Sequence, residues 1–156
     1  MLQITILMVG KTREGFIREG LEFYQKRLKP LMQLNLKSVR EAKEGGGLAP
    51  EALKAKEGER LRGQVAAKSY LVALDPRGKE LTSEEFAGWL DQRELAARPL
   101  IFLIGGHWGL ADEVLAAADE RLSLSRLTLT HELARLVLLE QLYRAMTIRM
   151  GHPYHV

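Results

Sequence analysis

The chain has 156 residues, which is enough for one ordinary domain with a buried core and too few for two. Hydrophobic residues make up 46% and charged residues 28% of it, a balance that excludes disordered and fibrous proteins. With no cysteine, the chain forms neither a disulfide nor a thiolate metal site, and its net charge of +3 fits a polyanionic partner without requiring one.

The apolar opening MLQITILMVG has no basic segment before it and no small-residue cleavage site, so it predicts a strand rather than a signal peptide. No apolar run reaches the roughly 20 residues that cross a bilayer. We therefore expect a single domain over residues 1–156 that works in the cytoplasm without a membrane partner.

The spacing of the apolar residues alternates between the strand period and the helix period, which predicts an α/β domain. The expected architecture is a mostly parallel sheet with helices on both faces. We expect the strand at 32–39 at an edge of the sheet and the continuously apolar strand at 99–106 at its centre. The other strands are expected at 2–9 and 69–75, and the helices at 15–28, 50–67, from 83 to before 99, from about 111, and at 131–149.

Three local patterns refine these boundaries. Thr82 and Glu85 have the spacing of a capping box, so a helix is expected to begin at Ser83. The run DPRG at 75–78 fits a type I turn, which predicts that the chain reverses there. The glycine-rich segment EGGGLAP at 44–50 is the predicted hinge.

A glycine loop, GGHWG at 105–109, follows the expected central strand. It lacks the dinucleotide-binding fingerprint, because G-x-G-x-x-G would need glycine at Ile104. Asp112 and Glu113 in the next helical turn would also repel a phosphate. The loop therefore argues against a phosphate-bearing cofactor. Two interpretations remain: a tight turn that needs glycines, or a site that a large, weakly anionic ligand approaches closely.

In RLSLSRLTLT, residues 121–130, the leucines change sides across Ser125 and Arg126, which a regular strand does not allow. A bulge or turn must interrupt the strand and leave backbone groups unpaired near Ser125. The segment is either a plain connection to the next helix or a site whose backbone groups bind the edge of a purine.

The final helix has apolar residues on two sides, whereas a surface helix needs only one stripe. We therefore predict a homodimer through this C-terminal helix. Glu140 and Arg144 have the spacing of a helical ion pair. The chain then ends in GHPYHV at 151–156, an unusual composition for a chain end.

The segments LIGGHWGL, LSLSRLTLTHELARLVLLEQLYRA and HPYH, in this order and spacing, resemble the RlmH family. These are the bacterial ribosomal RNA large subunit methyltransferases H of the SPOUT class. The resemblance extends over the whole chain and is most specific in its C-terminal third. It implies a SPOUT-type α/β fold with a C-terminal trefoil knot, and a homodimer. It also implies methylation of the N3 position of a pseudouridine in 23S ribosomal RNA, with S-adenosylmethionine and on assembled ribosomes.

Carried over position by position, the family's cofactor contacts fall where the residues alone indicate a strand end, a permissive loop and a broken strand. These positions are Leu74, Gly106, Ser125, Arg126, Leu127, Thr128, Leu129 and Thr130. S-adenosylmethionine has a purine, a ribose and a sulfonium but no phosphate, which agrees with the glycine loop. His107 and Trp108 depart from the family, in which many members carry Pro-Glu.

The acceptor nitrogen of an imide is a poor nucleophile until its proton leaves, so a base or an anion-stabilising cation is expected in the site. The candidates are Arg144, Tyr154 and His155. Arg144 is expected to stabilise a phosphate or developing anion, and His155 is the candidate base. We interpret the tail as a substrate-facing lip that the final helix holds close to the cofactor loops.

The residues alone leave two rival functions, a non-enzymatic RNA-binding module and a nucleotide-dependent oxidoreductase. Calorimetry with S-adenosylmethionine and with NAD would distinguish the methyltransferase from these two alternatives. A metal site is disfavoured, because the four histidines match no helical pair and have no acidic partner in sequence.

Overall fold

The computed structural model describes residues 1–43 and 46–156, so residues 44 and 45 of the predicted hinge lie outside the described residues. Within the described part, five parallel strands form one sheet in the order β2-β1-β4-β3-β5. They are β1 Gln3–Val9, β2 Gln33–Val39, β3 Tyr70–Glu80, β4 Leu100–Ile104 and β5 Glu120–Ser123.

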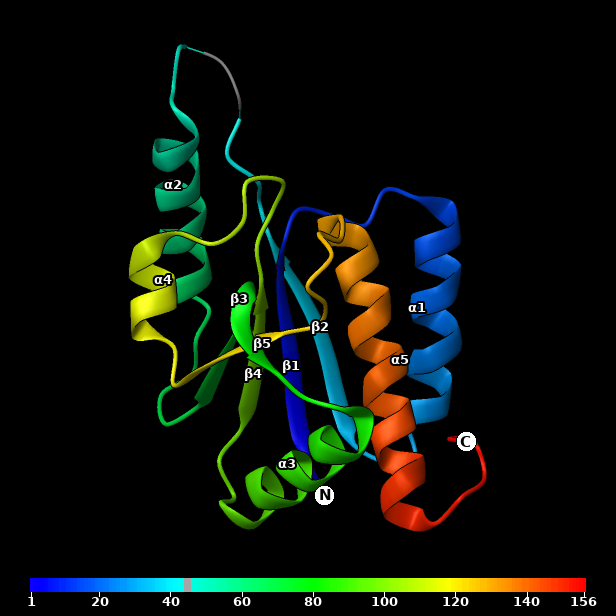
Figure 1. Ribbon diagram of the computed structural model, residues 1–156. Coiled ribbons are helices and arrows are strands. Elements are labelled where there is room, and N and C mark those ends of the chain that lie inside the picture. Colours follow the sequence, from blue (N-terminus) through cyan, green and yellow to red (C-terminus); the bar gives the residue numbers. More distant parts are fainter. Residues whose placement is uncertain (44–45) are drawn as a thin grey trace.

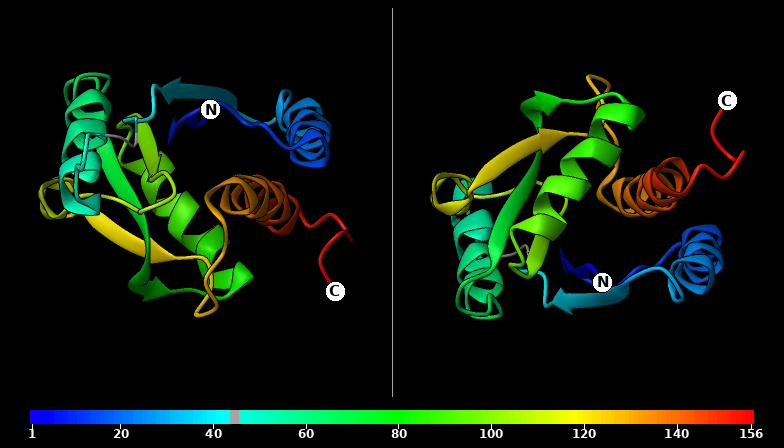
Figure 2. Two further views of the ribbon diagram at one scale, coloured as in Figure 1. Left: turned by 90° about the horizontal axis from the view of Figure 1, so that it is seen from above. Right: turned by 90° about the horizontal axis from the view of Figure 1, so that it is seen from below.

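Helices cover both faces of this sheet, as Figures 1 and 2 show. They are α1 Gly15–Leu28, α2 Pro50–Arg62, α3 Ser83–Leu95, α4 Asp112–Ala117 and α5 His131–Met150. The helices α1, α3 and α5 pack on one face, and α2 and α4 pack on the other. The predicted α/β class, with a parallel sheet between two helical layers, is confirmed. No helix among the described residues is long and apolar enough to cross a membrane.

The positions of β4 and β2 in the sheet follow from their sequences. All five residues of β4, LIFLI, are buried, because helices cover both sides of the sheet at its centre. In β2 no residue is fully buried, as expected of a strand with one unpaired edge. Both predicted positions are confirmed.

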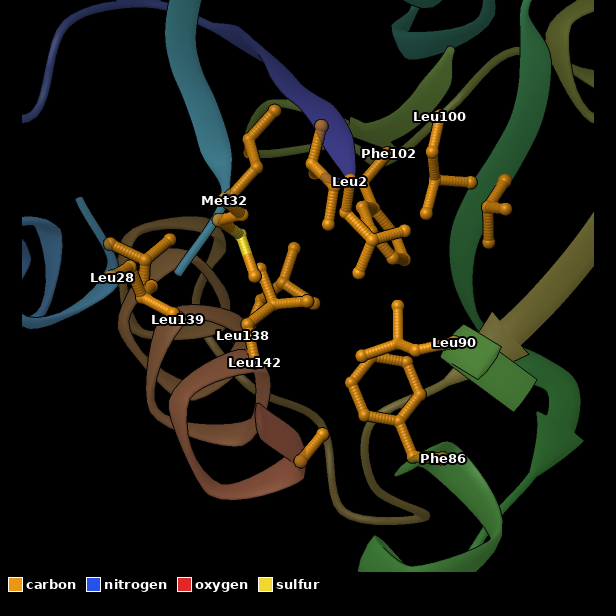
Figure 3. Packing of buried hydrophobic residues seen from close by; sticks show 14 of the residues in the cluster. Leu2, Leu28, Met32, Phe86, Leu90, Leu100, Phe102, Leu138, Leu139 and Leu142 are labelled. Carbon is orange, nitrogen blue, oxygen red and sulfur yellow. The ribbon is translucent and has the colours of Figure 1, made fainter. Parts of the chain in front are cut away.

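The larger hydrophobic core lies between the sheet and the layer of α1, α3 and α5 (Figure 3). Phe102 of β4, Leu90 of α3 and Leu139 of α5 belong to this core, and each is fully buried. At Gly20, α1 approaches α5 so closely that a Cβ would lie 2.7 Å from Leu136 Cδ1. The Leu136 side chain of α5 therefore packs directly against the backbone of α1 at this glycine.

The predicted chain reversal at 75–78 is wrong. β3 continues past these residues, and Leu74 and Lys79 both lie opposite Leu122 of β5 in the same parallel sense. Asp75 Oδ1 does accept a hydrogen bond of 3.1 Å from the backbone N–H two residues later. The turn-favouring residues therefore form a local bulge, while pairing with β5 keeps the strand direction.

Local signals account for three of the helix ends, although the end of one helix differs from the prediction. The capping box is confirmed, with Thr82 Oγ1 3.1 Å from the Glu85 N–H and Glu85 Oε1 2.8 Å from the Thr82 N–H. At the end of α5, Gly151 adopts a left-handed conformation with φ of 68°. The helix α2 ends at Arg62, earlier than predicted, because Gly63 disfavours its continuation.

Candidate cofactor cavity and C-terminal cluster

The carboxyl ends of β3, β4 and β5 open onto a cavity of about 690 Å³. Its walls come from the bulge of β3, from the loop between β4 and α4, and from the loop between β5 and α5 with the first turn of that helix. Ligands of open parallel sheets bind at this edge of the sheet. The volume falls within the range of small-molecule sites.

Seven of the eight predicted cofactor residues line this cavity: Leu74, Gly106, Ser125, Leu127, Thr128, Leu129 and Thr130. The eighth, Arg126, points outward, with its side chain 85% exposed and its Nε 3.8 Å from Glu80. Segments that are far apart in the sequence thus meet around one cavity.

The loop after β4 is folded too tightly to hold side chains at its base. A Cβ on Gly105 would lie 2.5 Å from the carbonyl carbon of Gly109. Gly106 and Gly109 form an isolated bridge, closed by an N–H···O hydrogen bond of 3.0 Å. Gly109 also has a φ of 88°, which side chains disfavour. The tight turn accounts for these glycines, and it places backbone against the cavity.

The predicted interruption near Ser125 is confirmed, since β5 ends at Ser123. Ser123 Oγ donates to the Ser125 carbonyl, and Ser125 Oγ accepts from the Leu127 N–H, both at 2.9 Å. Thr130 Oγ1 accepts from the Leu133 N–H at 3.1 Å and caps α5. Side-chain hydroxyls rather than a neighbouring strand shape this connection, so its residues line the cavity instead of extending the sheet.

Arg135, one turn into α5, is a buried anchor that sequence reasoning did not identify. Its side chain has 0% exposed surface. It donates to the carbonyls of Val9 and Gly10 at 2.7 and 3.0 Å and to Thr12 Oγ1 at 2.8 Å. The guanidinium thus fixes the loop after β1 against the start of α5. An arginine in an apolar helix fits a surface position equally well, so the sequence carries no clear signal for this role.

Glu132 holds the same loop from the other side. Its Oε1 accepts from the backbone N–H groups of Arg13 and Glu14, both at 3.0 Å. Burial alone would raise the pKa of Glu132, but these donors and the charge of Arg135 outweigh it and hold the pKa below its ordinary value. Burial and Arg135 lower the pKa of the neighbouring His131, so this residue of the cavity wall is neutral at neutral pH.

Glu57 of α2 is buried directly behind the glycine loop. Its side chain is 6% exposed, and Oε2 accepts a hydrogen bond of 3.1 Å from the Ala42 N–H. Its Oε1 has no hydrogen-bond partner among the described residues. A Cβ on Gly106 would lie 3.3 Å from that oxygen. Burial raises the pKa of Glu57 in spite of the hydrogen bond.

The three predicted catalytic residues lie together around Glu140, and we call these four residues the C-terminal cluster. Arg144 donates to Glu140 Oε1 from Nε and Nη2 at 3.0 and 2.7 Å. Its Nη1 lies 3.0 Å from Nδ1 of His155. Tyr154 donates to Glu140 Oε1 at 3.2 Å, and its ring centre lies 4.8 Å from the guanidinium carbon. The predicted ion pair of Glu140 with Arg144 is therefore present.

Hydrogen bonding also sets the proton state of the tail. The contact with Tyr24, burial and the charge of Glu140 raise the pKa of Tyr154, which makes it a donor rather than a base at neutral pH. Since arginine only donates, His155 Nδ1 accepts, and Nε2 donates to Glu84 Oε1 at 2.7 Å. Both ring nitrogens of the candidate base thus have partners in this arrangement.

The cavity and the C-terminal cluster lie at opposite ends of α5, so the prediction that this helix holds the tail close to the cofactor loops is wrong. Arg144 follows the cavity residue His131 by 13 positions. At 1.5 Å per residue they are roughly 20 Å apart. Figure 1 shows the C-terminus beside the far end of α5. Within one chain, the two sets of predicted residues do not meet.

The four histidines are divided between these places. His107 and His131 line the cavity, His152 follows the end of α5, and His155 belongs to the C-terminal cluster. In the part of the chain that the structure describes, no group of three or more histidine, aspartate or glutamate side chains could hold a metal ion.

The family described as "Predicted SPOUT methyltransferase" matches residues 2–155, a span that includes both the cavity and the cluster. This match defines the class of the protein. Two proteins named ribosomal RNA large subunit methyltransferase H, from Carboxydothermus hydrogenoformans and Geobacter metallireducens, are each 44% identical to the chain over 99% of both sequences. The chain therefore belongs to the RlmH family of SPOUT methyltransferases.

The fold has relatives among solved structures as well. The crystal structure of a probable methyltransferase from Bordetella pertussis Tohama I superimposes with a TM-score of 0.57 over 93% of this chain and 96% of that one. At 14% sequence identity this likeness concerns the fold alone. It agrees with the parallel α/β sheet, and the family resemblance found in the sequence is confirmed.

Proposed function

We propose that the protein is a cytoplasmic, S-adenosylmethionine-dependent methyltransferase that acts on the N3 position of a pseudouridine in 23S ribosomal RNA, on assembled ribosomes. The observation that carries the proposal is the meeting of seven predicted cofactor residues around one cavity at the carboxyl ends of the strands. Relatives named for methylation of large-subunit ribosomal RNA support the choice of substrate. We also propose that the three loops around the cavity form a SPOUT-type trefoil knot.

The residues of the cavity fit this cofactor. Its wall combines leucine side chains, which suit the faces of a purine, with hydroxyl and backbone groups, which suit the polar edges of a purine and a ribose. The acidic first turn of α4, with Asp112 and Glu113, disfavours a phosphate but not a sulfonium. When bound, S-adenosylmethionine supplies an electrophilic methyl group. The chain's own task is to hold the acceptor base in line with it.

We assign anion stabilisation to Arg144. Its guanidinium is permanently charged, donates two hydrogen bonds to Glu140 and lies over the ring of Tyr154. As the acceptor nitrogen loses its proton, this charge stabilises the resulting anion or an adjacent phosphate. His155 Nδ1 accepts the proton in this scheme once the arriving RNA draws Arg144 away from it.

We further propose a homodimer. The cavity and the C-terminal cluster of one chain are too far apart to act on one base, whereas a two-fold related copy can bring its cluster to this chain's cavity and receive the same in return. Every residue of α5 before Met150 is buried or half-buried within the chain itself. In the proposed dimer, α5 contacts its counterpart through the part of its surface that α1 and α3 do not cover, which includes the half-buried Val137.

The test begins with calorimetry. S-adenosylmethionine should bind and NAD should not, whereas RNA binding without S-adenosylmethionine binding would support the non-enzymatic module instead. Mass mapping of 23S RNA from a strain lacking the protein should show an unmethylated pseudouridine that the purified protein methylates on isolated ribosomes. A pseudouridine still methylated in that strain would rule out the substrate.

Mixed dimers test whether two chains share a site. Arg144→Ala removes the cation from the cluster, and Gly105→Val closes the cavity loop. Neither homodimer should methylate, but a mixture of the two should recover activity, because one of its two sites has an intact cavity and an intact cluster. A mixture without activity would contradict the shared site.

A further inference from the structure

The wall of the cavity includes an aromatic pair, His107 and Trp108, that is not among the predicted cofactor residues. His107 and Trp108 form the tip of the tight turn between Gly106 and Gly109. The side chain of Trp108 is 45% exposed, and its ring meets that of His107 edge to face, with centroids 4.8 Å apart. The hydrogen bond between the ends of the turn closes it beneath these two rings, and Trp108 lies at the wall of the cavity.

The other tryptophan of the chain, Trp89, shows how differently a core tryptophan is placed. It is 8% exposed, stacks on Phe86 at 5.6 Å and donates its Nε1–H to Glu120. A half-exposed indole forgoes much of the free energy that Trp89 gains from burial. Tryptophan is enriched where proteins recognise their partners, and an exposed ring at a cavity mouth suits that role.

One exposed apolar side chain and one cation, Arg77, also line the cavity, and a second cation, Arg126, lies on the same loop as Leu127 but points away from the cavity. Leu127, on the loop after β5, lines the same cavity and is 77% exposed. Arg77 is bound by Asp75 at 3.0 Å, yet its side chain is 76% exposed. Arg126 lies 3.8 Å from Glu80 and is 85% exposed. Each guanidinium lies beside a carboxylate and remains accessible from solvent.

The two exposed guanidinium groups suit RNA better than they suit a positively charged cofactor. A sulfonium is a cation, which guanidinium groups repel, whereas they attract the phosphates of RNA. The net charge of +3 of the chain also favours binding of a polyanion such as RNA. Sites for single-stranded RNA combine such cations with aromatic rings on which bases stack.

We propose that Trp108 is a stacking platform for an unpaired RNA base next to the methylated nucleotide, with Arg77 and Arg126 bound to the flanking phosphates. This inference rests on the proposed function, because it requires an RNA that enters the cavity. It gives the enzyme a preference for single-stranded loops, since the bases of a duplex are already stacked on each other.

Methylation kinetics test this role, with ribosomes from a strain lacking the enzyme as substrate. Trp108→Ala should raise the KM for ribosomes by about 5- to 150-fold, which corresponds to the loss of one stacked base. Trp108→Phe keeps an aromatic face and should recover most of the loss. The affinity for S-adenosylmethionine, measured by calorimetry, should not change. Leu95→Ala, which truncates an 86% exposed side chain at the end of α3, is the matched control and should change neither value.

Tryptophan fluorescence gives a readout that does not depend on activity. A single-stranded oligouridylate should quench the emission of the wild type, and a blunt RNA duplex of the same length should quench it much less. In Trp108→Phe the remaining emission comes from the buried Trp89 and should not respond to either RNA.

Two outcomes would overturn the inference. An unchanged KM in Trp108→Ala, beside a wild type that methylates ribosomes, would show that no base stacks on this ring. An equal loss of S-adenosylmethionine affinity in the same variant would assign Trp108 to the cofactor instead. A wild type that binds no S-adenosylmethionine would refute the proposed function rather than this inference.

Discussion

Replacing Arg135 by methionine should destabilise the protein by about 3–5 kcal/mol, because three acceptors of a buried guanidinium lose their donor together. The side chain is fully buried and donates to the carbonyls of Val9 and Gly10 and to Thr12 Oγ1. Methionine fills much of the volume but donates nothing. Each acceptor left without a donor costs about 1–3 kcal/mol, and the buried carboxylate of Glu132 loses its neighbouring cation.

Urea unfolding and thermal melting followed by circular dichroism measure this loss. In a domain of this size, 1 kcal/mol corresponds to a decrease in Tm of about 2–4 °C, so Arg135→Met should lower Tm by about 6–20 °C. Arg40→Met, which changes an exposed arginine after β2, is the control and should stay within about 0.5 kcal/mol of the wild type.

A double-mutant cycle isolates the interaction between the two buried charges. Glu132→Gln should destabilise the wild type more than it destabilises Arg135→Met, with a coupling of about 0.5–3 kcal/mol. If Arg135→Met loses less than about 1 kcal/mol, the range expected for an ordinary single hydrogen bond, the proposed anchoring of the loop after β1 is refuted.

Three further predictions follow from the cavity and the tail. Gly105→Ala should abolish S-adenosylmethionine binding, because the new Cβ would lie 2.5 Å from the Gly109 backbone. The control is Gly88→Ala in α3, where a Cβ would meet nothing within 4 Å; this variant should still bind S-adenosylmethionine and should be more stable by about 0.5–1 kcal/mol. Equal affinities of the two variants in calorimetry would contradict the expectation for Gly105. Glu57→Gln should change the pH dependence of stability: the folded pKa of Glu57 is raised from 4.5, so its favourable contribution is fully present below pH 4.5 and is lost as the pH rises through the folded pKa. In urea unfolding the variant should therefore gain on the wild type as the pH rises, and parallel curves would exclude an ionising Glu57. Deleting residues 153–156 should leave S-adenosylmethionine binding intact and abolish methylation, and unchanged turnover would show that the tail is not part of the site.

Short-range signals and burial patterns were sufficient to predict much of the fold. The continuous apolar run of β4 identified a strand covered on both faces, and Thr82 with Glu85 identified the start of α3. The run at 75–78 was misread because its residues do satisfy a local turn, as the Asp75 hydrogen bond shows. Whether a turn reverses a strand depends on its neighbour in the sheet, and that pairing with β5 is a contact between distant segments.

The cavity was easier to predict than its relation to the tail. Loops that follow adjacent parallel strands end at the same edge of the sheet, so Gly106 and Ser125 were expected near each other. The tail follows α5 directly, and the sequence therefore predicts it near these loops, but a helix of 20 residues moves the chain by about 30 Å. Arg135 and Glu57 were not predicted as buried, since charged side chains are rarely buried without partners that only the folded chain provides.

The length of α5 has a consequence for how the protein behaves at low concentration. Because the cavity and the C-terminal cluster lie apart along this helix, the proposed dimer implies that a dissociated chain keeps its cofactor cavity but lacks the cluster that completes the reaction centre. Dilution below the dissociation constant of the proposed dimer should therefore affect cofactor binding and turnover differently. Cofactor binding persists at one molecule per chain, while the turnover per chain falls with the fraction of chains that are paired.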